Sequence, residues 1–257
     1  MLPGMAQPNI NISCVMPTTA KRLWCLGRSI RCWLRQTWQT RDLLIVSEGG
    51  GKEVIARAIR REGRDDPRIR HVHFSSPPFA TLGGKYDYSI ALADGPYIAL
   101  WADDDWNAPE RLEFIMGGIT KMGVSIAGSR TMVCYRVRDK TAWLYMSDPQ
   151  LPHLISGTMI FHKDVWRRHP WPHVQSGSDT TWVFSVLWPK EVTEDGPGGE
   201  EYALMDDPRI YCAFVHADCT GNMLDRGRDH RKVWERLDGY DLRKLIKEDR
   251  EAFGLEP

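Results

Sequence analysis

Short apolar segments alternate with helical apolar spacing along the first half of the chain. Ile10–Met16, Leu43–Ser47 and Arg68–Phe74 are each typical of a core strand. Between them, apolar residues recur at helical spacing over Lys21–Trp38, and a second helix is expected over Glu53–Glu62. This β-α-β-α-β order predicts a parallel α/β sheet in the N-terminal half.

The next apolar run ends in three consecutive carboxylates. Tyr97–Trp101 predicts a buried strand, and Asp103, Asp104 and Asp105 follow it closely. Pro109 then opens a helix, because proline needs no amide donor in a first turn. Ligands bind at the carboxyl ends of strands in open α/β sheets, and adjacent carboxylates repel one another unless a cation lies close. We therefore expect a ligand site that takes a cation, although a solvated acidic turn is the alternative.

Beyond residue 121 the pattern changes to short strands without intervening helices. A further strand is expected at Leu154–Phe161, a helix at Thr180–Leu187 and a last strand at Arg209–His216. The sheet is therefore expected to become mixed within a single domain. The predicted divisions are a leader over 1–9, a nucleotide-binding half over 10–121, an acceptor half over 122–220 and a C-terminal helical extension over 221–257.

Composition excludes some classes of protein. The formal charge is zero, with 34 basic and 34 acidic residues, so no global field draws the chain to nucleic acid or anionic lipid. The six cysteines show no zinc-type spacing, and reduced thiols in a cytoplasmic protein are the simplest interpretation. No apolar run reaches the roughly 20 residues that span a bilayer. We expect a cytoplasmic protein without a transmembrane segment.

Four segments in this order resemble glycosyltransferase family 2. They read CVMPTTAKR…LRQTW…LLIVSEGG, LGGKYDYSIALADGPYIALWADDDWNAPERLE, SGTMIFHKDVWRRHPWPHVQSGSDTTWV and YCAFVHADCTGN. The resemblance implies a GT-A-type fold, an α/β, Rossmann-like mixed sheet flanked by helices. It also implies transfer of a sugar from a nucleotide-diphosphate donor, with UDP-sugar as the expected donor.

The resemblance assigns roles to individual residues. Asp179 matches the catalytic base of the family, and a single base in line with the leaving group implies inversion at the sugar. Asp105 matches the metal-holding carboxylate, His216 can complete the metal or diphosphate site, and the expected cofactor is Mn²⁺ or Mg²⁺. The residues expected around the nucleotide sugar are Pro17, Thr18, Thr19, Arg22, Glu48, Lys85, Asp103 and Asp104.

Three positions depart from the family pattern, and several alternatives stay open. Glu48 follows a serine where the family often has two aspartates, Ala102 replaces the first acid of the metal motif, and Ser178 replaces the glutamate before Asp179. A nucleotidyltransferase or a non-catalytic nucleotide-sugar binder is the competing class. Asp179 could simply cap a helix. The expected acceptor is a saccharide, a glycan or another hydroxyl, with a hydroxymethylated base in DNA as the minority alternative.

Overall fold

The first half of the chain builds one side of a parallel sheet. This computed structural model describes residues 9–147, 154–187, 200–216 and 233–237. Strand β1 pairs in parallel with β2 and β4, and β2 pairs in parallel with β3. The elements are β1 (Ile12–Thr19), α1 (Leu23–Leu34), β2 (Arg41–Glu48), α2 (Lys52–Gly63), β3 (Ile69–Phe74), α3 (Leu82–Leu92) and β4 (Tyr97–Leu100). The predicted order of strands and helices is confirmed here.

The second half extends the same sheet and makes it mixed, as predicted. Over the described residues the sheet has seven strands in the order β10-β6-β9-β4-β1-β2-β3. Strand β9 runs antiparallel to both of its neighbours, β4 and β6. The added elements are α4 (Arg111–Met122), β6 (Ile126–Ser129), β9 (Ile160–His162), α5 (Lys163–Arg168), α6 (Ser178–Leu187) and β10 (Tyr202–Met205).

A second sheet was not predicted. Among the described strands, five pair in the order β12-β8-β7-β11-β5. Only Arg130 separates β6 from β7, and its amide donates to the Met205 carbonyl of the first sheet while its carbonyl accepts from Ser147. The chain therefore crosses from one sheet to the other at this residue. The strands are β5 (Trp106–Asn107), β7 (Thr131–Arg136), β8 (Thr141–Met146), β11 (Tyr211–Val215) and β12 (Val233–Arg236).

Two predicted elements need correction. The strand expected at Leu154–Phe161 begins instead with a 3₁₀ turn, Ser156–Thr158, and only its end belongs to β9. Gly157 lies so close to the Tyr211 hydroxyl that a Cβ would overlap it, so β11 packs directly against this turn. The C-terminal extension was expected to be helical, but its described part is strand β12, which pairs antiparallel with β8. The rest of that extension and most of the leader lie outside the described residues.

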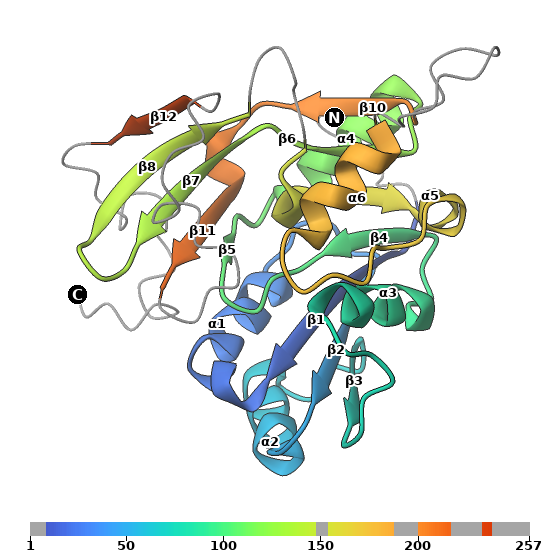
Figure 1. Cartoon of the computed structure of the whole chain (residues 1–257), viewed down its shortest axis with the longest axis vertical. Coiled ribbons are helices and arrows are strands. Elements are labelled where there is room, and N and C mark those ends of the chain that lie inside the picture. Colours follow the sequence, from blue (N-terminus) through green and yellow to red (C-terminus); the bar gives the residue numbers. More distant parts are fainter. Residues whose placement is uncertain (1–8, 148–153, 188–199, 217–232, 238–257) are drawn as a thin grey trace.

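Helices cover both faces of the seven-stranded sheet (Figure 1). Successive side chains of a strand point to opposite faces, so Cys14 and Met16 join one core and Val15 joins the other. The first core is shared with α1, α2 and α4, and the second with α3, α5 and α6. No described helix is long and apolar enough to cross a membrane.

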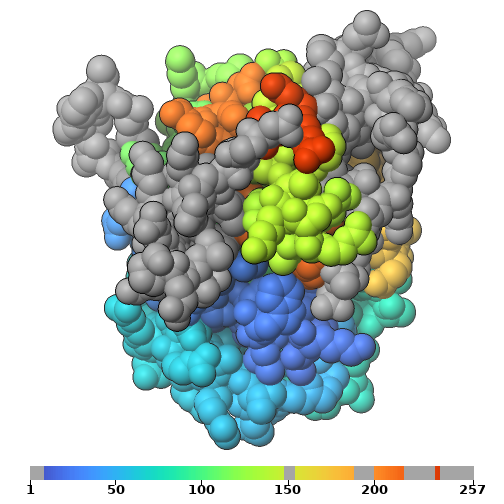
Figure 2. Space-filling view, turned by 90° about the vertical axis from the view of Figure 1, so that its left-hand side faces the viewer, coloured from blue at the N-terminus to red at the C-terminus, as the bar shows by residue number. Residues whose placement is uncertain are grey.

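The second sheet lies against one end of this layered core. Figure 2 shows the β7–β8 hairpin (yellow-green) above the N-terminal elements (blue). Strand β11 contacts α1 directly, since the Arg28 guanidinium lies 4.5 Å from the centre of the Phe214 ring. This contact brings β11 to the carboxyl ends of β1 and β4, where the acidic residues lie.

Candidate active site

A cavity of about 730 Å³ lies where the two sheets meet. Its wall combines the carboxyl ends of β1, β2 and β4 with the 3₁₀ turn at residues 156–158, the start of α6 and strand β11. Parallel strands present their carboxyl ends at one edge of a sheet, which is why residues far apart in sequence gather there. All of the predicted site residues except His216 line this cavity: Pro17, Thr18, Thr19, Arg22, Glu48, Lys85, Asp103, Asp104, Asp105 and Asp179.

Asp103 and Asp104 share one guanidinium. The Thr18 hydroxyl donates to Asp103 over 2.7 Å, and Arg22 donates to Asp103 over 3.1 Å and also to Asp104. His216 Nε2 lies 3.0 Å from the Asp104 carboxylate. His216 is nearly buried and packs edge-on against Trp24. The structure therefore places His216 beside Asp104, outside the lining of the cavity but in contact with its acidic cluster.

Asp105 is held by the second sheet. The Tyr211 hydroxyl donates to one carboxylate oxygen, and the Phe214 amide donates to the other over 2.9 Å. Each oxygen keeps a second lone pair for another ligand. The side chain of Asp105 is accordingly fixed by strand β11, a strand that the sequence links to the site only through His216.

Burial and mutual repulsion shift the pKa values of the three acids apart. Burial, followed by the charge of Asp104, raises the pKa of Asp103 to about 6 and that of Asp105 to about 7. Burial also acts to raise the pKa of Asp104, but hydrogen bonding from His216 and the charge of Arg22 lower it below its ordinary value. Asp104 therefore keeps its negative charge to a lower pH than either of its neighbours.

Glu48 and Lys85 form an ion pair at the other end of the cavity. Lys85 Nζ donates to the Thr18 carbonyl oxygen over 2.7 Å and to Glu48 over 3.1 Å. Burial lowers the pKa of Lys85, and the charge of Glu48 opposes that shift. Most of the lysine side chain is buried, whereas the Glu48 side chain is 31% exposed. Glu48 can therefore still accept a hydrogen bond from a ligand.

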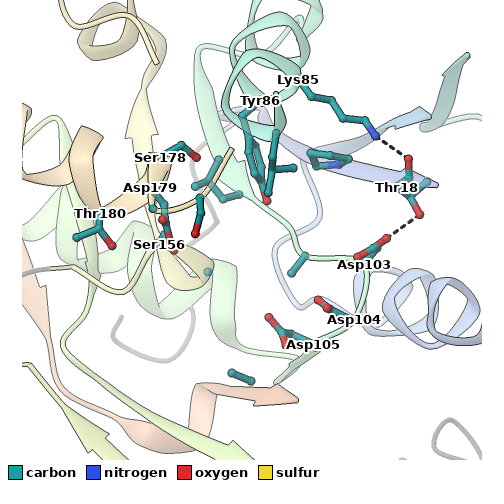
Figure 3. Close-up of a pocket in the computed structure, with 18 of the residues that line it drawn as sticks. Thr18, Lys85, Tyr86, Asp103, Asp104, Asp105, Ser156, Ser178, Asp179 and Thr180 are labelled. Carbon is teal, nitrogen blue, oxygen red and sulfur yellow. Dashed lines mark hydrogen bonds between the residues drawn. The ribbon is translucent and has the colours of Figure 1, made fainter. Parts of the chain in front are cut away.

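Asp179 faces the acidic cluster from the opposite wall (Figure 3). It lies in the first turn of α6, and the Ser156 hydroxyl donates to its Oδ2 over 2.6 Å. Among the described residues no backbone amide donates to this carboxylate, so it does not serve as a helix cap there. Its second oxygen accepts no hydrogen bond from the described part of the chain, which leaves it available to a ligand.

Sequence reasoning missed three residues of this site. Ser156 holds Asp179, Tyr211 holds Asp105, and Tyr86 extends into the cavity from α3. Tyr86 directly follows Lys85, and Tyr211 lies on the strand that leads to His216, so proximity to assigned residues was the available signal. Nothing in the sequence pairs Ser156 with Asp179, because the contact depends on the unpredicted 3₁₀ turn.

The acidic cluster has the chemistry of a divalent-cation site that a ligand completes. No group of three or more His, Cys, Asp or Glu side chains is arranged to hold a metal ion by itself within the described ranges. Magnesium-type ions, however, are commonly bound by one or two carboxylates together with substrate phosphates. Three carboxylates lie here beside Arg22 and His216, so a bound diphosphate would add negative charge that a divalent cation would offset.

The layered α/β fold is the one that the family resemblance predicted. The family model described as Glycosyl transferase family 2 matches residues 13–180, and the chain belongs to this family. The match spans β1 to the start of α6 and so includes the acidic cluster and Asp179. No curated protein matches the chain.

Solved structures share the fold at low identity. S. aureus TarS 1–349 in complex with UDP-GlcNAc superposes with a TM-score of 0.59 and 13% identity, covering 82% of this chain and 60% of that one. Another structure of S. aureus TarS gives 0.55 and 14%, with 80% and 37% covered. The mannosyltransferase PcManGT from Pyrobaculum calidifontis, in complex with GDP-Man and Mn²⁺, gives 0.56 and 10%, with 79% and 56% covered. The chain thus spans about 37–60% of the length of these proteins.

Proposed function

We propose that this glycosyltransferase moves a sugar from a nucleotide-diphosphate donor, with UDP-sugar as the first choice, to an acceptor hydroxyl with inversion. The observation that carries the proposal is the placement of Asp179 across one cavity from the cluster of Asp103, Asp104 and Asp105. A displacement needs a group that stabilises the leaving diphosphate on one side and a base for the attacking hydroxyl on the other.

The nucleoside would lie between the ends of β1 and β2. Pro17, Thr18 and Thr19 line this part of the cavity, and the exposed edge of Glu48 offers an acceptor for a ribose hydroxyl or a base N–H. Lys85 Nζ already donates hydrogen bonds to Glu48 and to the Thr18 carbonyl oxygen. It would therefore hold Glu48 in place rather than contact the phosphates. Arg22, together with Asp103 and Asp104, would lie at the diphosphate.

Mn²⁺ or Mg²⁺ would be held by Asp105 with His216, whose Nε2 lies 3.0 Å from the Asp104 carboxylate. When bound, the cation would neutralise the charge that develops on the leaving diphosphate. Tyr211 and the Phe214 amide orient the Asp105 carboxylate for this role by holding one lone pair of each oxygen. The PcManGT structure, which shares the fold, contains Mn²⁺.

Asp179 would take the proton of the acceptor hydroxyl through its second oxygen. Ser156 fixes the first oxygen, so the carboxylate is presented in one orientation. Because a single base acts from the face opposite the leaving group, one displacement occurs and the anomeric configuration inverts. The proposed acceptor is a hydroxyl of a saccharide or glycan. The alternative acceptor, a hydroxymethylated DNA base, is suggested by the basic cluster Arg226–Arg236 and by the many tryptophans, and most of that cluster lies outside the described residues.

The test is release of nucleoside diphosphate from UDP-glucose, UDP-galactose, UDP-GlcNAc and GDP-mannose, with Mn²⁺ or with EDTA, over a panel of saccharide acceptors. We expect one donor to be consumed only with metal, and NMR of the product to show the inverted anomer. Retention of configuration would contradict the role of Asp179. Equal turnover in EDTA would contradict the metal site.

A further inference from the structure

Tyr86 places a hydroxyl in the middle of the cavity. Figure 3 shows its side chain extending from α3 into the space between Ser156 and Asp179 on one wall and Thr18 and Asp103 on the other. No residue in the described part of the chain forms a hydrogen bond with this hydroxyl. Thr18, Asp103, Ser156 and Asp179 each take part in a hydrogen bond within the chain, whereas the Tyr86 hydroxyl is open to a ligand.

Packing fixes the direction in which Tyr86 points. Its ring lies 5.6 Å from that of Trp171, which is buried and stacks in turn on Trp182 of α6. The neighbouring carboxylate of Asp87 accepts hydrogen bonds from Trp166 Nε1 and from the Trp171 amide, which ties α3 to this segment. A hydroxyl on such a supported ring costs little further ordering when a ligand binds.

The electrostatic surroundings keep the hydroxyl protonated. Burial raises the pKa of Tyr86, and the charges of Asp179 and of the acidic cluster raise it further. The hydroxyl therefore keeps its proton, and can donate a hydrogen bond, at neutral pH. Those same charges show that the ring lies within electrostatic reach of both catalytic walls.

We propose that Tyr86 is a specificity-determining residue that donates a hydrogen bond to an oxygen substituent of the transferred sugar. This rests on the proposed function. The sugar must lie between the diphosphate at the acidic cluster and the acceptor at Asp179, because the anomeric carbon exchanges bonds between those two groups. Tyr86 occupies that interval, whereas the nucleoside lies beyond Thr18. The hydroxyl should thus contribute to binding of the sugar and not to binding of the nucleoside diphosphate.

The experiment compares calorimetric affinities of Tyr86→Phe and wild-type protein for UDP and for UDP-GlcNAc, UDP-glucose, UDP-galactose and GDP-mannose, all with Mn²⁺. Phenylalanine keeps the packing on Trp171 and removes only the hydroxyl. We expect the affinity for UDP to stay within about twofold. The affinity for the preferred nucleotide sugar should fall by roughly five- to thirtyfold, the cost of an unmade buried hydrogen bond. Tyr88→Phe, an exposed tyrosine on the same helix, is the matched control and should change neither affinity.

Each other outcome overturns the assignment in a distinguishable way. An equal loss for UDP and for the nucleotide sugar in Tyr86→Phe would place the hydroxyl at the nucleotide. Unchanged affinities, with thermal unfolding like that of wild type, would show that the hydroxyl does not contact the sugar. Wild-type protein that bound none of the five nucleotides would contradict the proposed function itself and the Tyr86 assignment with it.

Discussion

Ser156 donates a 2.6 Å hydrogen bond to Asp179 from a turn that lies 23 residues earlier in the chain. The turn in which Ser156 lies is braced by β11, because Gly157 leaves room for the Tyr211 hydroxyl. Tyr211 in turn donates to Asp105. Ser156 and Gly157 are adjacent, so the orientation of the proposed base, Asp179, and that of the proposed metal ligand, Asp105, both depend on the packing of Tyr211 against this turn.

Replacement of Asp179 by asparagine should abolish most of the transfer and spare the donor site. Loss of a general base typically costs 10²–10⁴-fold, roughly 3–5 kcal/mol of activation free energy. The measurement is kcat for sugar transfer together with the Kd of the donor, which should stay near that of wild type because Asp179 faces the acceptor. A transfer rate close to that of wild type would remove Asp179 from the mechanism.

Ser156→Ala provides the internal control for that assignment. Loss of a hydrogen bond to a charged group should lower kcat by roughly ten- to a hundredfold, with the KM of the donor unchanged. In the Asp179→Asn background the same change should cost less than about twofold, because the carboxylate it positions is gone. Full additivity of the two changes would mean that Ser156 acts on the fold and not through Asp179.

Asp105→Asn should remove the Mn²⁺-dependent part of the affinity for UDP. The amide loses the negative charge and can no longer accept from both Tyr211 and the Phe214 amide, so the free energy of unfolding should also fall by about 1–3 kcal/mol. Calorimetry with UDP in Mn²⁺ and in EDTA measures the first effect. Tyr211→Phe, which breaks one of these hydrogen bonds but keeps the carboxylate, should retain the metal dependence. If Asp105→Asn retained it too, the ligand assignment would be wrong.

Arg22 and a cation bound at Asp105 should compete for the negative charge of the same acidic cluster. Arg22→Ala leaves Asp103 and Asp104 without their shared guanidinium, so the free energy of unfolding should fall by about 3–5 kcal/mol. Mn²⁺ alone, without nucleotide, should then raise the melting temperature of the variant more than that of wild type. Arg31→Ala, which removes a cation paired with Glu62 on α2, should respond to Mn²⁺ as wild type does. A smaller Mn²⁺ response in Arg22→Ala would contradict the competition.

Two glycines should respond in opposite directions to the same substitution. A methyl group at Gly157 would overlap the Tyr211 hydroxyl, so Gly157→Ala should lower the free energy of unfolding by about 1–3 kcal/mol and weaken transfer. Gly117 lies inside α4 with open space at its Cβ position, so Gly117→Ala should raise the free energy of unfolding by about 0.5–1 kcal/mol. Thermal unfolding checks both. Normal stability and activity in Gly157→Ala would show that the turn can move away from β11.

The sequence predicted the part of the fold that local patterns determine. Strands β1 to β4 and helices α1 and α2 follow the apolar pattern closely, and Asp103–Asp105 lie where the end of a core strand predicted them. The second sheet could not be predicted in this way, because the alternation of apolar and polar residues indicates a strand but not the strand with which it pairs. Strand β5 has two residues and β10 lies in an acid-rich segment, so neither produced a readable pattern.

The sequence predicted those site residues whose chemical type alone suggests a role. Asp179 and the acidic cluster were expected from the family resemblance, and the structure brings them to one cavity. Ser156, Tyr86 and Tyr211 were missed, since a hydroxyl gains its role from a neighbour that only the fold supplies. The contact of Tyr211 with Asp105 joins residues 106 positions apart, which no local pattern reports.

The dependence of Asp105 on β11 also sets an order of events during synthesis. Its partners Tyr211 and Phe214 are made 106 and 109 residues later, which at ribosomal rates means a delay of roughly 5–20 seconds. Arg22, by contrast, is already present when Asp103 and Asp104 emerge. A nascent chain can therefore pair two of the three acids with Arg22 as soon as β1 and β4 come together, whereas the third carboxylate is held in place only after residue 214 has been made.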